Sequence, residues 1–283
     1  MNILVTGSTG YLGSNFIRKY KNEHSFTSIK RKNKNSLLNS IDYEKIYDSK
    51  VIQNNLNKFD LLIIFSNIYE SEECNNTDFI KVNLLYTMEI YNFSKKIKIP
   101  KVIFFDTTLN KKINRYSFSK KMLIEWFERF NHDEKLIIIK FDFMFGFNDK
   151  RFTDNLVKNL LVNKKKIPLT SGYQKRNFIY IEDLLISINS IILNSYKIKK
   201  ITFVDLKSMN DLTLKKFVTL IINELQNQTN KKFHNRLLWN VLKKRLYENS
   251  KPTLNNKNTL RIKSNHYQVI EKSIKLLISH YVK

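Results

Sequence analysis

The chain has 283 residues, 42% of them hydrophobic, which suits a globular protein of one large domain or two lobes. A single cysteine excludes a disulfide framework and a cysteine-based metal site, and the histidines show no ligand spacing, so we expect no metal. The longest apolar runs are too short to span a bilayer. No basic and apolar leader precedes the first predicted strand, and we therefore expect a cytoplasmic protein without stable membrane insertion.

The formal net charge of +25 is unusually high. A polyanionic partner, such as nucleic acid, an anionic membrane surface or a phosphorylated substrate, would account for it. Lysine-rich codon usage would account for it too, because the lysines are scattered along the chain rather than gathered in one arm. We favour the second explanation and expect no nucleic-acid partner, and a phosphate-bearing substrate needs only a few of these charges.

The first predicted strand, Ile3–Thr6, runs directly into a glycine-rich turn. Gly7, Gly10 and Gly13 follow it at even spacing, and Ser14–Lys21 is predicted to be a helix. A strand, a glycine turn and a helix in this order are typical of a dinucleotide-binding site, in which glycines let the backbone approach a pyrophosphate and let helix and strand pack closely. The N-terminus of the helix offers free N–H groups to the phosphates.

Short apolar runs alternate with helical stretches over the first half of the chain, which predicts a parallel sheet covered by helices on both faces. The predicted strands are Ile3–Thr6, Phe26–Ile29, Val51–Ile52, Leu61–Phe65, Val102–Phe105 and Leu136–Phe141, and the predicted helices are Ser14–Lys21, Asp78–Ile97 and Tyr116–Phe130. We therefore expect an α/β Rossmann fold, a doubly wound parallel sheet, over residues 1–165.

The pattern loosens after Gly146, and we expect a smaller, mostly helical substrate-binding lobe over residues 166–283, with one or two strands returning to the main sheet. The elements expected after this glycine are helices at 153–162, 183–194 and 214–225 and strands at 178–181 and 201–204. Within Lys231–Asn249, apolar residues recur at helical spacing among basic ones. This predicts an amphipathic helix whose apolar face belongs to the core or lies on anionic lipid.

Tyr116 and Lys120 are four residues apart at the start of a predicted helix, so their side chains project from one face. A neighbouring ammonium stabilises phenolate and lowers the pKa of a tyrosine, as a general acid–base near neutral pH requires. The strand Val102–Phe105 leads to Thr107 and Thr108. Their hydroxyls are therefore expected at the carboxyl end of a parallel strand, where α/β folds bind ligands.

With the glycine loop, the strand-end hydroxyl and Tyr-x-x-x-Lys in this order, the chain resembles the extended short-chain dehydrogenase/reductase family, of the NAD-dependent epimerase/dehydratase type. Within that family it is similar to the CDP-abequose and CDP-paratose synthases, which are 4-keto reductases of CDP-dideoxy sugars. The resemblance implies a nucleotide-sugar substrate and a homodimer formed through Asp78–Ile97 and Tyr116–Phe130. Trp126 would then pack in the core or at the dimer interface.

The resemblance also implies roles for individual residues. Thr107, or Thr108 as the alternative one residue on, would be catalytic together with Tyr116 and Lys120, and Arg176 would grip the nucleotide part of the substrate. The residues implied for cofactor binding are Gly7, Thr9, Gly10, Tyr11, Leu12, Gly13, Arg31, Asn55, Leu56, Ser66, Asn83, Tyr116 and Lys120. The segment between the threonines and Tyr116 is much shorter than in most members of the family, a departure that bears on the substrate pocket.

The expected reaction follows from two further features. After Phe26–Ile29 comes Lys30–Lys32, with Arg31 at its centre, where an NAD enzyme places an acidic residue; cations suit the 2′-phosphate of NADP. The similar 4,6-dehydratases carry Asp-Glu after the catalytic threonine, whereas Thr107 is followed by Thr-Leu-Asn, so we do not expect dehydration. We expect NADPH-dependent reduction of a 4-keto sugar nucleotide in surface polysaccharide biosynthesis, with Tyr116 protonating the C4 oxygen.

Other functions compete with this one. An NAD-dependent C4 epimerase would use the same three side chains. A non-catalytic Rossmann protein that senses a cofactor, or a basic surface-binding protein, would belong to a different class, and the presence of both Tyr116 and Lys120 argues against the sensor. The nucleotide, the sugar and the stereochemistry at C4 are left open.

Overall fold

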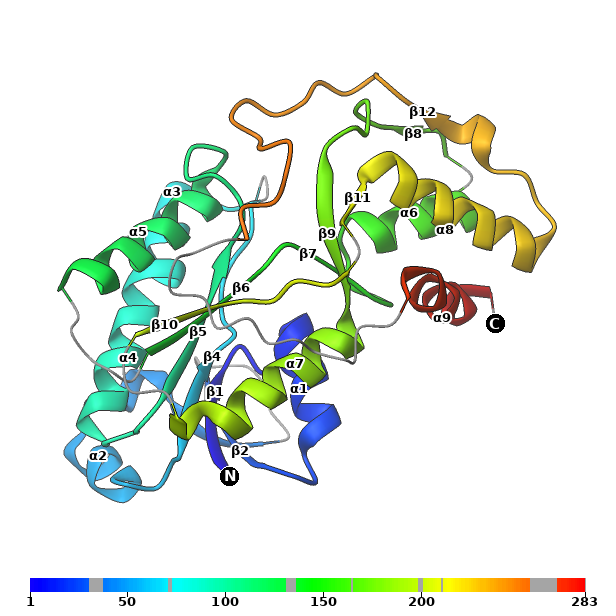
Figure 1. Ribbon diagram of the computed structural model, residues 1–283. Helices are drawn as coiled ribbons and strands as arrows, with labels where there is room; N and C mark the ends of the chain where they lie inside the picture. Colours follow the sequence, from blue (N-terminus) through cyan, green and yellow to red (C-terminus); the bar gives the residue numbers. More distant parts are fainter. Residues whose placement is uncertain are drawn as a thin grey trace.

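The computed structural model of the chain describes residues 1–30, 38–70, 73–130, 136–163, 165–197, 201–209, 211–254 and 269–282. Its centre is a parallel seven-stranded sheet with the order β10-β6-β5-β4-β1-β2-β3 (Figure 1). The strands are β1 (Asn2–Thr6), β2 (Ser25–Lys30), β3 (Asn39–Asp42), β4 (Leu61–Ile64), β5 (Val102–Thr107), β6 (Leu136–Phe141) and β10 (Thr202–Asp205). The order reverses between β1 and β4, which is the arrangement of a doubly wound Rossmann sheet. The predicted fold class is confirmed.

Helices cover both faces of this sheet, and alternate residues of each strand supply the two cores. Ile3 of β1 packs in the core with Phe16 of α1 (Tyr11–Tyr20), and α7 (Ile181–Asn194) joins the same face. The next residue, Leu4, points the other way into a second core with residues of α4 (Thr87–Lys96) and α5 (Arg115–Phe130). Successive side chains of a strand point to opposite faces, so strands buried on both sides must be apolar throughout.

The C-terminal part adds small sheets and helices beside the main sheet (Figure 1). A three-stranded sheet has the order β11-β9-β7, and β12 pairs with β8. The elements of this part are β7 (Phe143–Phe145), α6 (Phe152–Leu161), β8 (Ile167–Pro168), β9 (Lys175–Tyr180), β11 (Asp211–Thr213), α8 (Leu214–Thr229), β12 (Leu237–Leu238) and α9 (Ile270–Val282). Phe178 of β9 stacks on Phe217 of α8 with ring centroids 3.8 Å apart, which joins sheet to helix. Strand β10 pairs with β6, so the chain crosses back into the main sheet.

Two predicted elements of the first half differ from the structure. The predicted strand Val51–Ile52 lies within α2 (Ser49–Asn55), whose N-cap Asp48 accepts a hydrogen bond from the backbone of Lys50. A two-residue apolar run cannot distinguish strand from helix, and here the cap decides for the helix. The predicted helix Asp78–Ile97 is three segments, namely α3 (Asn76–Phe79), a π-helix (Ile80–Tyr86) and α4.

The amphipathic helix predicted for Lys231–Asn249 is also wrong. The segment contains the short 3₁₀ turn His234–Arg236, then β12 and irregular backbone. Phe233 and Leu237 are buried, at 2% and 8% exposure, whereas Leu246 is 74% exposed, so the apolar residues share no common face. Helical spacing alone therefore misled the prediction, because these side chains are buried by separate tertiary contacts.

Among the described residues, no helix is long and apolar enough to cross a membrane.

Candidate active site

A cavity of about 940 Å³ lies at the carboxyl edge of the main sheet, between the sheet and the C-terminal elements. Its walls come from the turn between β1 and α1, the ends of β4 and β5, the start of α5, and from α6, β8 and β9. Residues 242–248 contribute from the chain after β12. In an open parallel sheet, this edge near a reversal of strand order is where ligands bind.

The glycine loop enters this cavity in a conformation that only glycine tolerates. Gly7 has a φ of +68°, and a Cβ there would lie 2.6 Å from the backbone nitrogen of Ser66. A Cβ on Gly13 would lie 2.4 Å from the Gly7 carbonyl oxygen, so α1 packs directly on the turn. At Gly10, a Cβ would meet only that same oxygen, at 3.2 Å, which leaves backbone open to the cavity.

The N-terminus of α1 fits a dinucleotide pyrophosphate. Its N-cap Gly10 has no side chain to bond the first N–H groups, and the first turn carries no acidic residue. Tyr11 and Leu12 line the cavity beside it, and the Tyr11 hydroxyl donates to the Phe147 carbonyl at 3.1 Å. Free N–H groups at the positive end of a helix dipole bind anions.

The other predicted cofactor residues are spread more widely. Ser66 Oγ lies 2.8 Å from Thr6 Oγ1 and ties the end of β4 to β1, outside the cavity lining. Asn55 and Leu56 lie at the end of α2; the Asn55 amide donates to the Val51 carbonyl at 2.8 Å, and neither residue lines the cavity. Thr9, which is exposed, and Gly7 also lie outside the lining. Arg31 lies outside the described residues.

Asn83 does not line the cavity, and its side chain instead joins the loop after β4 to α5 by hydrogen bonds. From the π-helix, its side chain accepts from the Ile68 backbone N–H at 2.9 Å and donates to the Ile68 carbonyl at 3.1 Å. It also donates to Ser119 Oγ on α5 at 3.0 Å. These bonds fix the loop after β4 against α5. They hold Tyr69, the next residue of that loop, beside the start of the helix.

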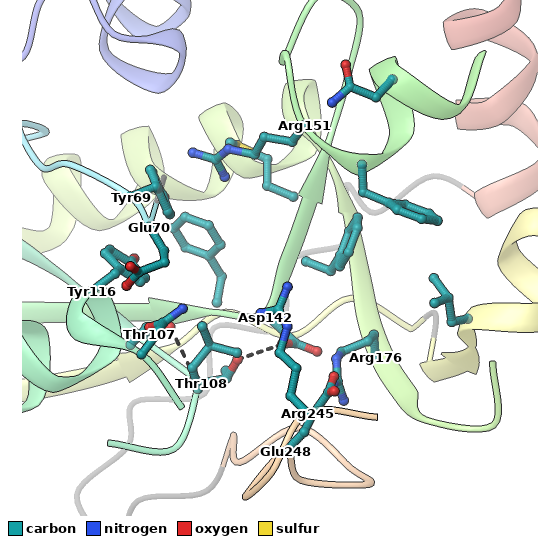
Figure 2. A pocket seen from close by; sticks show the side chains of 18 of the residues that line it. Tyr69, Glu70, Thr107, Thr108, Tyr116, Asp142, Arg151, Arg176, Arg245 and Glu248 are labelled. Atoms are coloured by element: carbon teal, nitrogen blue, oxygen red, sulfur yellow. Dashed lines mark hydrogen bonds and ion pairs between the residues drawn. The ribbon is translucent and has the colours of Figure 1, made fainter. Parts of the chain in front are cut away.

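Tyr116 and Lys120 both line the cavity from the first turns of α5. The helix begins there because Asn114 caps it, with Asn114 Oδ1 accepting from the Ser117 backbone at 2.8 Å and Ser117 Oγ accepting from the Asn114 backbone at 3.2 Å. Figure 2 shows Tyr116 beside Thr107 and under Tyr69. The predicted phenol, ammonium and strand-end hydroxyl therefore share one cavity.

The two threonines at the end of β5 differ in their partners (Figure 2). The Thr108 hydroxyl donates to Asp142 Oδ1 at 2.5 Å. The Thr107 hydroxyl accepts from the Leu109 backbone N–H at 3.2 Å, and we find no acceptor for its proton among the described residues. Of the two alternatives, Thr107 thus has a donor available for a ligand oxygen.

The pKa of Tyr116 differs from the prediction. Burial raises it well above 10.0, and the neighbouring Tyr69 raises it further, whereas Arg151 lowers it. The rings of Tyr69 and Tyr116 lie 4.4 Å apart, and the Arg151 guanidinium lies 4.1 Å above the Tyr69 ring. Desolvation, rather than the expected lowering by Lys120, sets the direction of this shift, and the phenol is protonated.

Lys120 is 2% exposed and lies with its ammonium 4.2 Å from the centre of the Phe104 ring. Burial lowers its pKa from 10.5 to about 7, and Asp106 opposes this effect. Asp106 itself accepts from Lys121 Nζ at 2.7 Å. The buried ammonium is therefore close to neutralisation at physiological pH.

Arg176 lines the cavity, but its guanidinium is already occupied. It forms an ion pair with Glu248, which comes from the chain after β12. It also donates to the carbonyls of Lys175 and Asn249, at 2.7 and 3.1 Å. Arg176, which was predicted to bind the nucleotide part of the substrate, thus contacts a later segment of its own chain in this structure.

The model of the NAD-dependent epimerase/dehydratase family matches residues 3–201 of the chain. The chain belongs to this family. The match covers every main-sheet strand except β10, together with the glycine loop and the whole of α5.

Several solved structures are similar in fold to nearly the full length of this epimerase/dehydratase family member. UDP-glucuronic acid 4-epimerase from Bacillus cereus, in complex with NAD, is similar over 100% of this chain and 97% of its own, with 16% identity and a TM-score of 0.72. The dTDP-glucose 4,6-dehydratase from Bacillus anthracis, in complex with NAD, is similar over 99% of this chain and 96% of its own, with 15% identity and a TM-score of 0.71. UDP-N-acetylglucosamine 4-epimerase from Methanobrevibacter ruminantium, in complex with UDP-N-acetylmuramic acid, is similar over 99% of this chain and 98% of its own, with 15% identity and a TM-score of 0.71. At these identities the likeness shows the fold.

Several cavity residues of this family member were not predicted from its sequence, namely Tyr69, Arg151, Arg245 and Glu248. They come from loops or strand ends, where no periodicity or motif marks them. Among the described residues, no cluster of His, Cys, Asp or Glu could hold a metal ion.

Proposed function

We propose that this chain is an oxidoreductase that uses NADPH to reduce a 4-keto group of a nucleotide sugar. The observation that carries the proposal is the shared cavity, whose walls include Thr107, Tyr116 and Lys120 together with the Gly10 end of the glycine loop. Membership of the epimerase/dehydratase family supports the substrate class. A cytoplasmic location, favoured by the single cysteine, belongs to the same proposal.

Each of the three side chains has a role in this proposal. The nicotinamide, when bound, supplies hydride. Tyr116 holds a proton on its phenolic oxygen, and the burial that raises its pKa keeps that proton available for the alkoxide formed by reduction. Thr107 donates a hydrogen bond to the same oxygen, and Lys120 binds the ribose hydroxyls next to the nicotinamide. The N–H groups at the start of α1 and Gly10 would hold the pyrophosphate.

An NAD-dependent C4 epimerase is the second candidate. It is favoured by the NAD found in the Bacillus cereus epimerase and the Bacillus anthracis dehydratase. An epimerase begins by removing a proton from the C4 hydroxyl, for which Tyr116 would have to act as a base, whereas a reductase begins with the protonated phenol that burial of Tyr116 favours by raising its pKa. The preference for NADP rests on Lys30–Lys32, of which only Lys30, at the end of β2, is among the described residues.

A thermal-shift screen tests this function. We expect NADPH to raise the melting temperature more than NADH, and one of CDP, UDP, dTDP and GDP to raise it further, with CDP expected if the substrate matches that of the CDP-abequose and CDP-paratose synthases. A ligand at a hundred times its Kd adds about 2.7 kcal/mol to the free energy of unfolding. The protein should then oxidise NADPH when given the matching 4-keto sugar nucleotide.

A Gly10→Val variant is the control for this screen, since its side chain would fill the opening for the pyrophosphate while meeting only the Gly7 carbonyl. It should lose the dinucleotide response and keep the nucleotide response. An isolated protein that retains NAD and interconverts C4 epimers without added NADPH would identify the epimerase. Failure of every dinucleotide to stabilise the wild-type protein would refute both candidates.

We also propose that the protein is a homodimer formed through the outer face of α5 and the π-helix. On α5, apolar residues four positions apart share one face and are 39% to 60% exposed: Phe118, Met122, Trp126 and Phe130. Ile80 and Leu85 of the π-helix are 55% and 51% exposed. Contiguous exposed apolar patches of this kind mark protein interfaces.

Trp126→Glu should therefore dissociate the dimer. Buried tryptophans at the centre of an interface contribute about 2–4 kcal/mol, so we expect the dimer Kd to rise by roughly a hundredfold. Sedimentation velocity over a range of protein concentrations measures this. Val162→Glu, at an exposed position on the C-cap of α6, is the matched control and should leave the dimer intact. A wild-type protein that sediments as a monomer at micromolar concentration would contradict the proposal.

A further inference from the structure

A lysine of α5 ties that helix to the end of β5. Lys121 Nζ donates to Asp106 Oδ2 and to the Thr107 carbonyl oxygen, each at 2.7 Å. Both acceptors belong to the last two residues of β5, and Figure 1 shows α5 beside the main sheet. One ammonium group therefore joins the strand that carries the proposed catalytic threonine to the helix that carries Tyr116.

Asp106 lies on the face of the sheet that α5 covers. Phe104, two residues earlier, belongs to the core beneath α5, and alternate residues of a strand share a face. The Lys120 ammonium, 4.2 Å from the centre of the Phe104 ring, lies on this face too. The side chains of Asp106 and Lys121 are 3% and 24% exposed, so water screens their ion pair weakly. Asp106 thus holds the Lys121 ammonium at the end of the strand.

Asp106 is also one of three buried charges in a row across neighbouring strands. Asp106 of β5, Lys140 of β6 and Asp205 of β10 are in register, and Lys140 Nζ lies 3.3 Å from Asp205 Oδ1. Their side chains are 3% to 7% exposed. Buried ion pairs are often no more stabilising than apolar residues of the same volume, and the rest of this face is apolar. Stability alone therefore gives no reason for charges at this end of the sheet.

The position of the Thr107 hydroxyl depends on its own backbone. The hydroxyl accepts from the Leu109 backbone N–H at 3.2 Å, which is at the long end of the range for such bonds. A β-branched side chain has a stiff χ1, so the hydroxyl follows the backbone that carries it. The bond from Lys121 to the Thr107 carbonyl holds this backbone, and so fixes the hydroxyl relative to Tyr116 beside it (Figure 2).

We propose that Lys121 is a positioning residue, whose ammonium, aimed by Asp106, holds the Thr107 backbone so that the threonine hydroxyl and the Tyr116 phenol reach the same substrate oxygen. This inference rests on the proposed function. Lys121 lies outside the cavity lining, so it would touch neither the nucleotide sugar nor the dinucleotide. Its loss should therefore lower the rate of the chemical step and leave binding unchanged, because a displacement of about 1 Å can cost on the order of a hundredfold in rate.

Lys121→Met tests the proposal, because it keeps most of the length of the side chain and removes its charge and its donors. We expect kcat to fall by about thirtyfold, while KM and the Kd for NADPH stay within about twofold of the wild type. NADPH oxidation is measured with the 4-keto-6-deoxyglucose derivatives of CDP, UDP, dTDP and GDP, and turnover is expressed per NADPH site titrated. Lys121→Arg, whose guanidinium can donate to both acceptors, should recover kcat to within about threefold.

A double-mutant cycle tests whether Lys121 acts through Thr107. Thr107→Ala removes the hydroxyl, so adding Lys121→Met to it should lower kcat by less than about threefold further. A further loss of about thirtyfold would overturn the inference. If Lys121→Met unfolds because Asp106 is left unpaired, Asp106→Asn combined with Lys121→Met removes both charges. The same comparison, with and without Thr107→Ala, is then made on that pair, and the loss should be about tenfold larger when the hydroxyl is present.

Lys111→Met is the matched control. Lys111 Nζ also bonds a carboxylate, both oxygens of Glu125 on α5 at 2.8 and 2.6 Å, but it joins α5 to the loop after β5 rather than to the strand. This variant should keep the wild-type kcat, and a loss equal to that of Lys121→Met would overturn the inference. A wild-type kcat in Lys121→Met, with turnover lost in Tyr116→Phe, would overturn it and leave the proposed function intact. A wild-type protein that oxidises NADPH with none of the four compounds would overturn both.

Discussion

Tyr116→Phe should lower turnover by about a thousandfold and leave the affinity for NADPH within about twofold of the wild type, since positioned proton donors contribute 10²–10⁴ in rate. Phenylalanine keeps the ring that packs 4.4 Å from Tyr69. Only the phenolic oxygen is lost, and with it the proton for the C4 oxygen. Steady-state oxidation of NADPH with the 4-keto sugar nucleotide measures the rate, and dinucleotide titration measures the affinity.

Tyr69→Phe is the matched control, because Tyr69 presents a second phenol in the same cavity. Tyr69 is 41% exposed and comes from a loop, whereas Tyr116 is 6% exposed and fixed on a capped helix. We expect Tyr69→Phe to lower turnover by less than tenfold. A larger loss in Tyr69→Phe than in Tyr116→Phe would assign the proton to Tyr69 and refute the role given to Tyr116.

Much of the fold, and the side of the cavity lined by Thr107, Tyr116 and Lys120, was predictable because the responsible signals are local. Buried parallel strands must be apolar on both faces, and β1, β4, β5 and β6 show this as short runs without alternation. Tyr116 and Lys120 share one helix, so their spacing alone places them together. Thr107 lies at the end of a strand, and the topology brings all strand ends to one edge.

The remaining features depend on contacts between segments that are distant along the chain. Glu248 and Arg176 are 72 positions apart, and neither periodicity nor a motif connects them. The edge strand β3 is polar, with the sequence Asn-Ser-Ile-Asp, and was missed because only Ile41 of its four residues is buried. The raised pKa of Tyr116 was missed because spacing shows the nearby ammonium, while burial by Tyr69 and the loop after β4 arises only in the folded chain.

Lys120→Met should change both the pH dependence of stability and the rate. The folded pKa of Lys120 is about 7 against an ordinary 10.5, so between these values the unfolded chain binds more protons than the folded one. The contribution of this group to the free energy of unfolding therefore rises with pH, by up to about 1.4 kcal/mol per pH unit, and is most unfavourable below pH 7. Between pH 7 and 9 the wild type should gain about 2 kcal/mol relative to Lys120→Met.

Urea unfolding of the ligand-free protein at several pH values measures this difference, and Lys50→Met, at an exposed position on α2, is the control that should show no such change with pH. With NADPH and the 4-keto substrate, Lys120→Met should also lose about a hundredfold in turnover. A stability difference that stays constant from pH 7 to 9 would mean that Lys120 keeps its proton in the folded protein. The ammonium would then be stabilised by Asp106 more strongly than burial destabilises it, and Asp106→Asn would become the variant with the larger effect on Lys120.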